Sequence, residues 1–471
     1  MAFDRVHGPL AVWAAHQPQR LALSDGVSHY SFETLWQAVQ ARAAALDAAG
    51  QPPGAALLIP DDWSQCAQLC EFLAVIAGGR CAALGDPGWP VSQRAAAAQA
   101  LQRLPDSPEA LFYVGFTSGS TGRPKGFARS HASWIASFEA CNQAFGEKAR
   151  QAFFVPGRLA HSLFLFGMLH ALWNGATCVI QEKFSPGAAL RRLAEGDLSA
   201  MVAVPSQLLL MLDYARQHHL APLPAVGLLL IGGAQWPRQH TEALQGLFPN
   251  ADLRVFYGAS ELSFVAWAAA DAAAPVACVG RPFDGVSVTL RPLPGAPAAG
   301  NGLAPGTPGQ IWVRSAMAFA GYVGDSQADG SACQRDGDWL SVRDIGAIDA
   351  HGCLHLLGRL DRMLTVHAKK LFPEEVERVL ESCPGVVRAS VQAVPDALRG
   401  ARVVAALALD PEGVVTPQAV HRWCLQHLQR YKVPRRFYAA AEWRWTASGK
   451  TDHAAMATAI HSEALWLTRW Q

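Results

Sequence analysis

The chain has 471 residues, with 39 basic and 38 acidic side chains and hydrophobic residues at 51% of positions. This length favours two domains over a single core, and the hydrophobic content excludes a disordered chain. The formal net charge of +1 provides no electrostatic footprint for nucleic acid or a charged membrane surface, so neither is an expected partner.

The N-terminus and the cysteines indicate a cytoplasmic protein. Residues 1–5 (MAFDR) place an acidic residue where a signal peptide carries positive charge, and the apolar stretch that follows is too short for one. The ten cysteines form no CxxC pair, which favours buried thiols in a reducing compartment over disulfides or zinc ligands. The most apolar window, residues 163–180, contains His170 and Gly175. It predicts a buried helix followed by a strand, so no membrane span is expected.

Helix and strand patterns alternate through the first half of the chain. Residues 32–49 carry apolar residues at helical spacing after Ser31, a favourable N-cap. Stretches 55–59, 65–77 and 81–84 follow as strand, helix and strand, and the same alternation continues to about residue 256. The pattern predicts an α/β fold whose mostly parallel sheets are covered by helices.

Shorter strands replace this alternation after about residue 275. Segments 286–291, 309–314 and 354–357 lie between Gly and Pro turns, and they predict a small barrel-like β unit. A compact α+β pattern begins after Gly358. We therefore expect a large N-terminal domain over residues 1–358 and a small α+β C-terminal domain over residues 359–471.

The strongest local motif is the loop at residues 116–126 (FTSGSTGRPKG). Apolar, strand-like residues precede three glycines, four hydroxyl residues and Lys125. Backbone N–H groups of such a loop can approach phosphate oxygens, while the hydroxyls and the lysine add donors and charge. The alternative is an ordinary hairpin loop. The motif is not the P-loop of NTPases, because that loop carries a glycine directly before its lysine and here Gly126 follows Lys125.

Five further segments follow in a fixed order: residues 231–234 (IGGA), 257–261 (YGASE), Asp344, 358–361 (GRLD) and 448–450 (SGK). Together with the loop, they resemble the motifs of the adenylate-forming superfamily, which includes acyl- and aryl-CoA synthetases, peptide-synthetase adenylation domains and firefly luciferase. The resemblance covers nearly the whole chain. Each motif alone is weak evidence for the superfamily, but six motifs in the right order are together specific for it. It implies a stand-alone acyl- or aryl-acid ligase that forms an acyl-adenylate from ATP.

The resemblance also implies a site for ATP and Mg²⁺. Tyr257 offers a flat face for adenine, and Asp344 can accept hydrogen bonds from the ribose hydroxyls. Glu261 is a suitable Mg²⁺ ligand, with Thr117 as the second ligand that the resemblance implies. Taken alone, each of these residues also fits a structural or solvated role. The full set implied for ATP or AMP is Thr117, Ser118, Gly119, Ser120, Thr121, Gly122, Lys125, Gly233, Ala234, Tyr257, Gly258, Ser260, Glu261, Asp344 and Arg359.

The substrate is expected to be a small carboxylic acid. Amino-acid-activating relatives carry an Asp at the position of Ser162 that pairs with the substrate's α-ammonium, and an uncharged Ser162 leaves such an ammonium without a partner. An acid without an α-amino group is therefore expected, and nearby apolar side chains favour an apolar or aromatic one; core packing is the alternative role of those side chains. The resemblance implies an acid pocket of His161, Ser162, Phe166, Gly232, Trp236 and Ala259.

The C-terminal motif supplies the expected catalytic lysine, Lys450. A fixed ammonium there relieves the repulsion between the attacking carboxylate and the α-phosphate, and His161 is the second catalytic candidate. The resemblance implies a mobile C-terminal domain that swings about a hinge at Asp361, with Ala368 and Lys369 at the tunnel for the thiol. The acceptor is the phosphopantetheine thiol of CoA or of an acyl or peptidyl carrier protein.

Several positions depart from the family pattern. Arg343 replaces a Gly, Arg362 replaces an Asp, and Ala368 stands where a Gly is expected. Other uses of the adenylate, such as amide formation, and an inactive scaffold or regulator that keeps the fold both remain alternatives. The acid, the choice between CoA and a carrier protein, and the oligomeric state are left open. A basic run can meet CoA phosphates, an acidic carrier face or solvent: Arg430, Lys432, Arg435 and Arg436.

Overall fold

A computed structural model describes residues 3–470 apart from short gaps. The gaps are positions 106, 108, 412 and 414 and segments 119–123, 296–302, 325–332, 367–368, 397–399 and 446–450. The chain divides into two compact units, which are described separately: the first contains Met1–Thr289 and Trp312–Val342, and the second contains Leu290–Ile311 and Arg343–Gln471.

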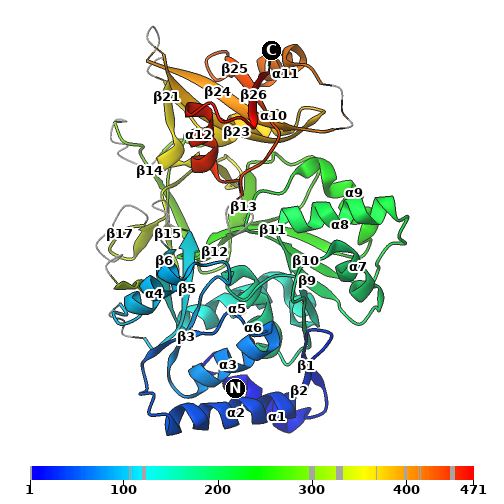
Figure 1. The fold of residues 1–471 in the computed structure, drawn as a ribbon, viewed down its shortest axis with the longest axis vertical. Helices are drawn as coiled ribbons and strands as arrows, with labels where there is room; N and C mark the ends of the chain where they lie inside the picture. The colour runs from blue at the N-terminus through cyan, green and yellow to red at the C-terminus, as the bar shows by residue number, and fades with distance from the viewer. Residues whose placement is uncertain are drawn as a thin grey trace. The chain divides into compact units, whose positions relative to one another are not determined.

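A largely parallel sheet forms the centre of the first unit. Its strands are aligned so that Ala203 lies opposite Ile231, and Ile231 lies opposite Val255. The alternation of strand and helix that the sequence shows therefore produces the predicted sheet (Figure 1). The strand order is β13 (Cys278–Pro282), β12 (Ser263–Ala269), β11 (Asp252–Ala259), β10 (Leu228–Ile231), β9 (Ala200–Ala203), β7 (Phe153–Val155), β8 (Cys178–Ile180), β1 (Leu21–Ser24) and β2 (His29–Ser31).

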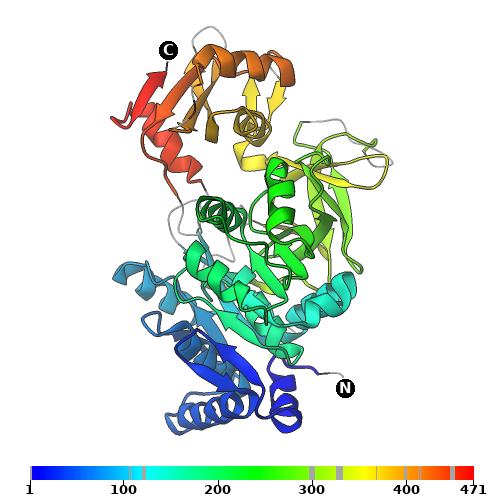
Figure 2. The ribbon, with the colours of Figure 1, turned by 90° about the vertical axis from the view of Figure 1, so that its right-hand side faces the viewer.

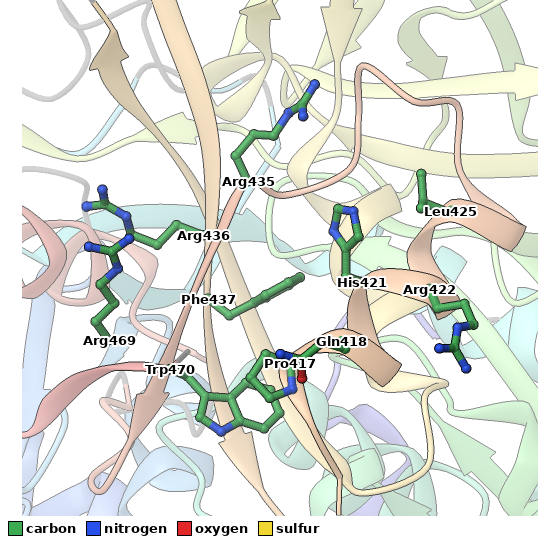
Figure 3. Close-up of a pocket in the computed structure, with 10 residues that line it drawn as sticks. All are labelled: Pro417, Gln418, His421, Arg422, Leu425, Arg435, Arg436, Phe437, Arg469 and Trp470. Carbon is green, nitrogen blue, oxygen red and sulfur yellow. The ribbon is translucent and has the colours of Figure 1, made fainter.

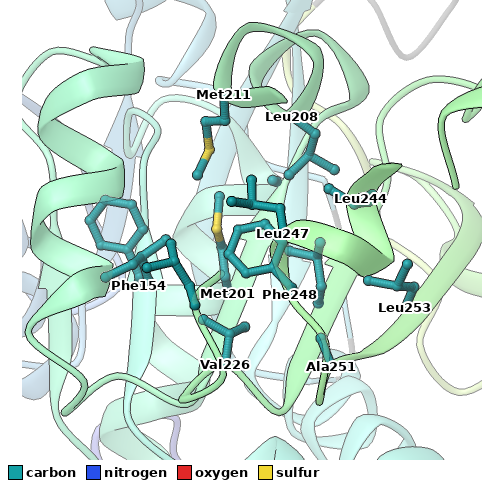
Figure 4. Packing of buried hydrophobic residues seen from close by; sticks show 14 of the residues in the cluster. Phe154, Met201, Leu208, Met211, Val226, Leu244, Leu247, Phe248, Ala251 and Leu253 are labelled. Atoms are coloured by element: carbon teal, nitrogen blue, oxygen red, sulfur yellow. The ribbon is translucent and has the colours of Figure 1, made fainter. Parts of the chain in front are cut away.

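Helices cover both faces of this sheet. The buried side chains of α7 (Pro186–Ala194), α8 (Pro205–Gln217) and α9 (Thr241–Leu247) form one core with Phe154, Met201 and Leu229. Figure 4 shows Phe154 and Met201 beside side chains of α8 and α9. Phe153 points the other way, with its ring centroid 5.6 Å from that of His170 in α6 (Ser162–Trp173). Neighbouring strand residues thus contact helices on opposite faces. α6 is followed by β8, as predicted for the apolar window.

A second sheet of the first unit carries the Gly-rich loop. Strands β3, β4 and β5 are parallel, whereas β5 and β6 form an antiparallel hairpin. α2 (Phe32–Ala48) begins after Ser31, whose hydroxyl accepts a hydrogen bond from Thr34 N, and α3 (Gln65–Ala77) joins β3 to β4. The strand–helix–strand prediction is confirmed. The order is β16 (Gly321–Tyr322), β6 (Pro124–Ser130), β5 (Leu111–Ser118), β4 (Cys81–Leu84) and β3 (Ala56–Ile59).

The second unit is built on four strands: β23 (Val386–Asp396), β24 (Gly400–Leu409), β25 (Arg436–Ala440) and β26 (Leu467–Trp470). On one face, α10 (Pro373–Glu381) and α11 (Pro417–His427) pack on alternate β24 residues such as Ala405. On the other face, α12 (His453–His461) packs on Val404 and Ala406. Figure 2 shows the ribbon of these helices and strands in yellow, orange and red. This arrangement is the predicted compact α+β pattern.

Residues 343–358 group with the second unit, so this compact unit begins earlier than the boundary expected after Gly358; the hinge there stays a prediction. In the described part of the chain, no helix is long and apolar enough to cross a membrane. The α-helices and strands not yet named are α1 (Gly8–His16), α4 (Val91–Ala100), α5 (His131–Phe145), β14 (Ser287–Arg291), β15 (Gly309–Arg314), β17 (Gln334–Asp336), β18 (Trp339–Ser341), β19 (Asp344–Ile348), β20 (Leu354–Arg359), β21 (Leu364–Val366) and β22 (Lys369–Leu371).

Candidate active site

The carboxyl ends of β7, β9, β10 and β11 meet at one edge of the first sheet, because these strands are parallel and in register. Ligands of open α/β sheets bind outside such ends. The ends of these strands and the segments that follow them carry ten of the residues implied by the resemblance: His161 and Ser162 after β7, Gly232–Ala234 after β10, and Tyr257–Glu261 at and after the end of β11. The fold therefore gathers residues about a hundred positions apart.

The end of β11 is shaped by Gly258. A bulge separates Tyr257 from Gly258 in the pairing with β12, and a Cβ at Gly258 would lie 2.2 Å from the backbone oxygen of Ser263. Only glycine permits that approach. Ser260 and Glu261 follow in the hairpin between β11 and β12. Tyr257 is 7% exposed, so its ring offers adenine little open surface, and stacking there remains a prediction.

Tyr322 links the expected phosphate lysine to the expected metal ligand. Its hydroxyl donates to Glu261 Oε1 at 2.9 Å, and Lys125 Nζ lies 5.8 Å from the centroid of its ring. The backbone N–H of Phe319 donates to the Glu261 carbonyl at 2.8 Å. Tyr322 is held in place because β16 pairs with β6, where it lies opposite Phe127. The structure thus brings Lys125 and Glu261 to one tyrosine, which the sequence analysis missed.

The Gly-rich loop connects β5 to β6. Thr117 lies opposite Lys125 in the hairpin, so both residues flank the loop. Gly126 has a packing role, since a Cβ there would lie 2.3 Å from Val323 Cγ2. Four residues of the expected phosphate site lie outside the described part of the chain: Gly119, Ser120, Thr121 and Gly122.

A buried arginine supports the Ser260–Glu261 turn. Arg129 is 2% exposed and donates to the carbonyl of Ser260 at 3.3 Å and to that of Met317 at 2.7 Å. Burial lowers the pKa of Arg129 to about 10, while the nearby Tyr113 and Glu261 act in the opposite direction. The guanidinium therefore stays cationic at neutral pH. No local motif contains Arg129, so the sequence carried no signal for this contact.

His161 and Ser162 lie at the start of α6, with His161 as the N-cap residue. The Tyr113 hydroxyl lies 3.4 Å from Ser162 Oγ, and burial raises the pKa of Tyr113 to about 12. Gly233 adopts φ +80°, and a Cβ there would lie 3.7 Å from Leu163 Cδ2. The IGGA loop and the start of α6 are therefore neighbours, and Tyr113 adds a neutral hydroxyl that the sequence analysis missed.

Two expected pocket residues lie in packed surroundings. Trp236 is 2% exposed within the core below α8 and α9, and its indole N–H donates to Thr241 Oγ1 at 2.9 Å. Phe166 is 6% exposed, with its ring centroid 4.9 Å from that of Phe264. These observations favour the packing alternative for both. A Cβ at Gly232 would meet the Phe256 ring at 2.3 Å, and Ala259 is partly buried opposite Ser263.

In the second unit, Asp344 and Arg359 lie opposite each other on β19 and β20. Arg359 is 3.5 Å from Asp344 Oδ1 and 3.5 Å from Asp361 Oδ2. Arg343, with φ +67°, is 3.0 Å from Asp361 Oδ1. The expected ribose carboxylate, the expected hinge aspartate and two arginines therefore form one alternating chain of charges.

The remaining candidates belong to the C-terminal segment. Lys450 and Ala368 lie outside the described part of the chain. Lys369 begins β22, and its Nζ lies 5.1 Å from the centroid of the Tyr431 ring. Arg362, one residue after Asp361, joins α10 through contacts to Glu374 at 3.0 Å and Glu377 at 2.6 Å.

Comparisons with known proteins identify the family of the chain. Residues 61–323 match the model of the AMP-binding enzyme family, and residues 375–450 match that of the AMP-binding enzyme C-terminal domain. An uncharacterized acyl–CoA ligase, YhfT of Bacillus subtilis, is 36% identical over 73% of this chain and 67% of its own length. A putative long chain fatty acid-CoA ligase, VraA of Staphylococcus epidermidis, is 28% identical over 73% of this chain and 70% of its own.

Solved structures show the same fold. The amide bond synthetase McbA from Marinactinospora thermotolerans is 25% identical, with a TM-score of 0.81 over 96% of this chain and 99% of its own. ATP-bound MatB from Rhodopseudomonas palustris has a TM-score of 0.84 over 97% of this chain and 99% of its own. MatB is 20% identical, so that likeness supports the fold alone.

Proposed function

Because the chain belongs to the AMP-binding enzyme family, whose adenylate-forming motifs it carries in order, we propose that it activates a carboxylic acid with ATP and passes the acyl group to a thiol. The carboxylate attacks the α-phosphate, which forms acyl-AMP and releases pyrophosphate. The thiol then attacks the acyl carbon, so that a thioester forms, AMP leaves and the thiol proton passes to solvent or a base.

The observation that carries this proposal is the meeting of Lys125 and Glu261 at Tyr322. Lys125 flanks the Gly-rich loop, and Glu261 Oε1 accepts the Tyr322 hydroxyl at 2.9 Å. A cation over the ring of Tyr322 and a carboxylate at its hydroxyl suit a magnesium–triphosphate, because the lysine attracts phosphate oxygens and the carboxylate attracts the metal.

The residues here fit Mg²⁺. This ion prefers one or two carboxylates plus phosphate oxygens and water. Among the described residues, Tyr322 occupies only one carboxylate oxygen of Glu261, and Thr117 adds a hydroxyl at the loop. When bound, Mg²⁺ offsets the negative charge of the triphosphate. Tyr322 and the Phe319 N–H hold Glu261 in place for it.

The start of α6 supports an acid without an α-amino group. Ser162 is uncharged and its hydroxyl faces that of Tyr113 at 3.4 Å, which burial keeps neutral by raising the pKa to about 12. A substrate ammonium beside these two hydroxyls lacks a carboxylate partner, and burying it unpaired is costly. We therefore propose an apolar or aromatic acid.

The remaining roles follow the family motifs. Asp344 serves the ribose and Arg359 the nucleotide, while Lys450 stabilises the charge that develops at the α-phosphate. Relatives named as CoA ligases support a thiol acceptor, CoA or a carrier protein's phosphopantetheine. The cytoplasm remains the proposed compartment; eight cysteines are free thiols in the structure, but Cys278 and Cys353 are disulfide-bonded, so the prediction of thiols throughout is wrong for these two residues.

Amide formation is the second candidate, because a solved amide bond synthetase is 25% identical over 96% of this chain. The same adenylate serves both reactions, and the acceptor separates them.

Pyrophosphate release is first measured for a panel of acids with ATP and Mg²⁺; the best acid is then supplied with CoA, holo carrier proteins or amines. Thioester formation supports the proposal, and an amide alone replaces it with the second candidate. If no acid elicits pyrophosphate release, the chain is an inactive relative.

A further inference from the structure

A groove of about 560 Å³ crosses the second unit between α11 and the strands β25 and β26. Figure 3 shows the side chains that line it. His421 and Arg422 come from α11, Arg436 begins β25 with Arg435 directly before it, and Arg469 comes from β26. None of the nucleotide or acid residues considered above belongs to this groove.

The groove carries charge of one sign. Four arginines line it, and none of its ten lining residues is acidic. Within the described part of the chain, none of these arginines lies within 4 Å of a carboxylate, and the Tyr438 hydroxyl receives a hydrogen bond from Arg436 at 3.3 Å. Neighbouring cations repel one another, so an anionic partner would relieve this repulsion and bind by charge complementarity.

Apolar side chains accompany the arginines. Leu425 is 47% exposed, and Trp470 is partly buried with its ring centroid 6.5 Å from that of Phe437. Gln418, Arg422 and Leu425 are spaced so that they share one face of α11. Arginine and aromatic residues around an apolar centre are typical of protein–protein interfaces.

The arginines do not converge on one point. In Figure 3, Arg436 and Arg469 lie together on one side of the groove, Arg422 lies on the other, and Arg435 points away from all three. A site for one phosphate group requires donors that converge. Cations spread around an apolar floor fit an elongated acidic surface instead, such as an amphipathic helix.

The structure also divides the basic run at residues 430–436. Lys432 is paired with Glu375, with Nζ–Oε distances of 2.6 and 2.7 Å, so its charge serves the fold. Arg430 is exposed but does not line the groove. Arg435 and Arg436 line it, together with Arg422 and Arg469, which lie outside the run.

We propose that this groove docks an acidic amphipathic helix of the protein that carries the acceptor thiol, an acyl or peptidyl carrier protein. The inference rests on the proposed function, which supplies the thiol acceptor, and it selects the carrier protein over free CoA. The acidic side chains of the helix meet the arginines, and its apolar face covers Leu425 and Trp470.

Direct binding tests the proposal without the reaction. Each acyl and peptidyl carrier protein encoded by the same genome is prepared in its apo form, which lacks the phosphopantetheine arm, and titrated against the full chain. We expect at least one to bind, and Arg436→Glu/Arg469→Glu to weaken it about tenfold or more. Arg430→Glu, an exposed reversal outside the groove, should stay within about twofold. Wild-type binding should weaken as salt rises from about 50 to about 300 mM.

Three results would overturn the proposal. The first is that no apo carrier protein binds. The second is that the groove variant Arg436→Glu/Arg469→Glu and Arg430→Glu bind the carrier with equal affinity. The third is that the groove variant loses CoA acylation as strongly as carrier acylation, which would make the groove a site for CoA phosphates. Pyrophosphate release by the wild type, measured with acid and ATP alone, tests the proposed function separately. Carrier binding without pyrophosphate release would refute that function and leave the docking surface in place.

Discussion

The guanidinium of Arg343 lies 3.0 Å from the carboxylate of Asp361, although Arg343 adopts φ +67°, a backbone conformation that favours glycine. The backbone N–H of Leu360 donates to the Arg343 carbonyl at 2.8 Å. Arg359 also contacts Asp361, at 3.5 Å, and reaches Asp344 on its other side. Arg343 and Arg359 therefore share the expected hinge aspartate, each through a different carboxylate oxygen.

Arg343→Gly should raise the KM for ATP severalfold and leave stability unchanged or slightly higher. Glycine relieves a strain of roughly 1–2 kcal/mol, but Asp361 is then left to Arg359 and draws it from the nucleotide. The measurements are an ATP titration of pyrophosphate release and the melting temperature. Arg343→Lys is the control, because it keeps the charge and should keep the KM. An unchanged KM in the glycine variant would show that the ion pair does not influence Arg359.

Tyr322→Phe should raise the Mg²⁺ concentration needed for half-maximal activity about tenfold. The change removes the hydroxyl that holds Glu261 and keeps the ring beneath Lys125; hydrogen bonds to charged groups contribute about 1.5–3 kcal/mol. A metal titration of pyrophosphate release measures this. Tyr214→Phe in α8 is the matched control. If both variants gave the same Mg²⁺ titration, the Tyr322 hydroxyl would not position Glu261 for the metal.

Ser162→Asp should lower activity on the preferred acid by about tenfold or more, because it places a carboxylate beside the buried Tyr113 and the substrate. Ser162→Ala should retain most activity. Rates are compared for the preferred acid and for its α-amino analogue, which the Asp variant should accept better. Full activity of Ser162→Asp on the preferred acid would place Ser162 outside the pocket.

Glu381 should make the stability of the second unit depend on pH. Burial raises the pKa of Glu381 to about 7, although Arg388 and the Ala389 N–H act against the rise. The folded state therefore holds this proton more tightly than the unfolded chain, so stability falls as pH rises from about 4.5 to about 7, by on the order of 2–3 kcal/mol. Glu381→Gln should melt increasingly above the wild type between about pH 5 and pH 8. A constant difference over that range would contradict the assignment.

The sequence predicted the elements more completely than their contacts. Strand–helix alternation and the Ser31 cap are local, so β3, α3, β4 and the start of α2 follow from it. Tyr322 lies 61 residues beyond Glu261, and Arg129 reaches Ser260 across 131 residues; such contacts exist only once the sheets have formed.

Local pattern also could not separate a pocket wall from a core. Trp236 follows the IGGA motif and Phe166 follows Ser162 along the chain. In the fold, however, Trp236 contacts Thr241 of α9 and Phe166 contacts Phe264. The four groove arginines lie in separate segments of the chain. The sequence could therefore indicate only Arg435 and Arg436, which belong to one basic run, and not Arg422 or Arg469.

The most direct test of the central claim, that the chain forms an acyl-adenylate, is acid-dependent pyrophosphate release by Lys450→Ala compared with the wild type. Loss of one preorganised electrostatic group costs about 10²–10³ in rate, while ATP binding, measured separately, should remain. We expect this fall in rate, with ATP still bound to the variant. Wild-type pyrophosphate release by the Lys450→Ala variant would contradict it.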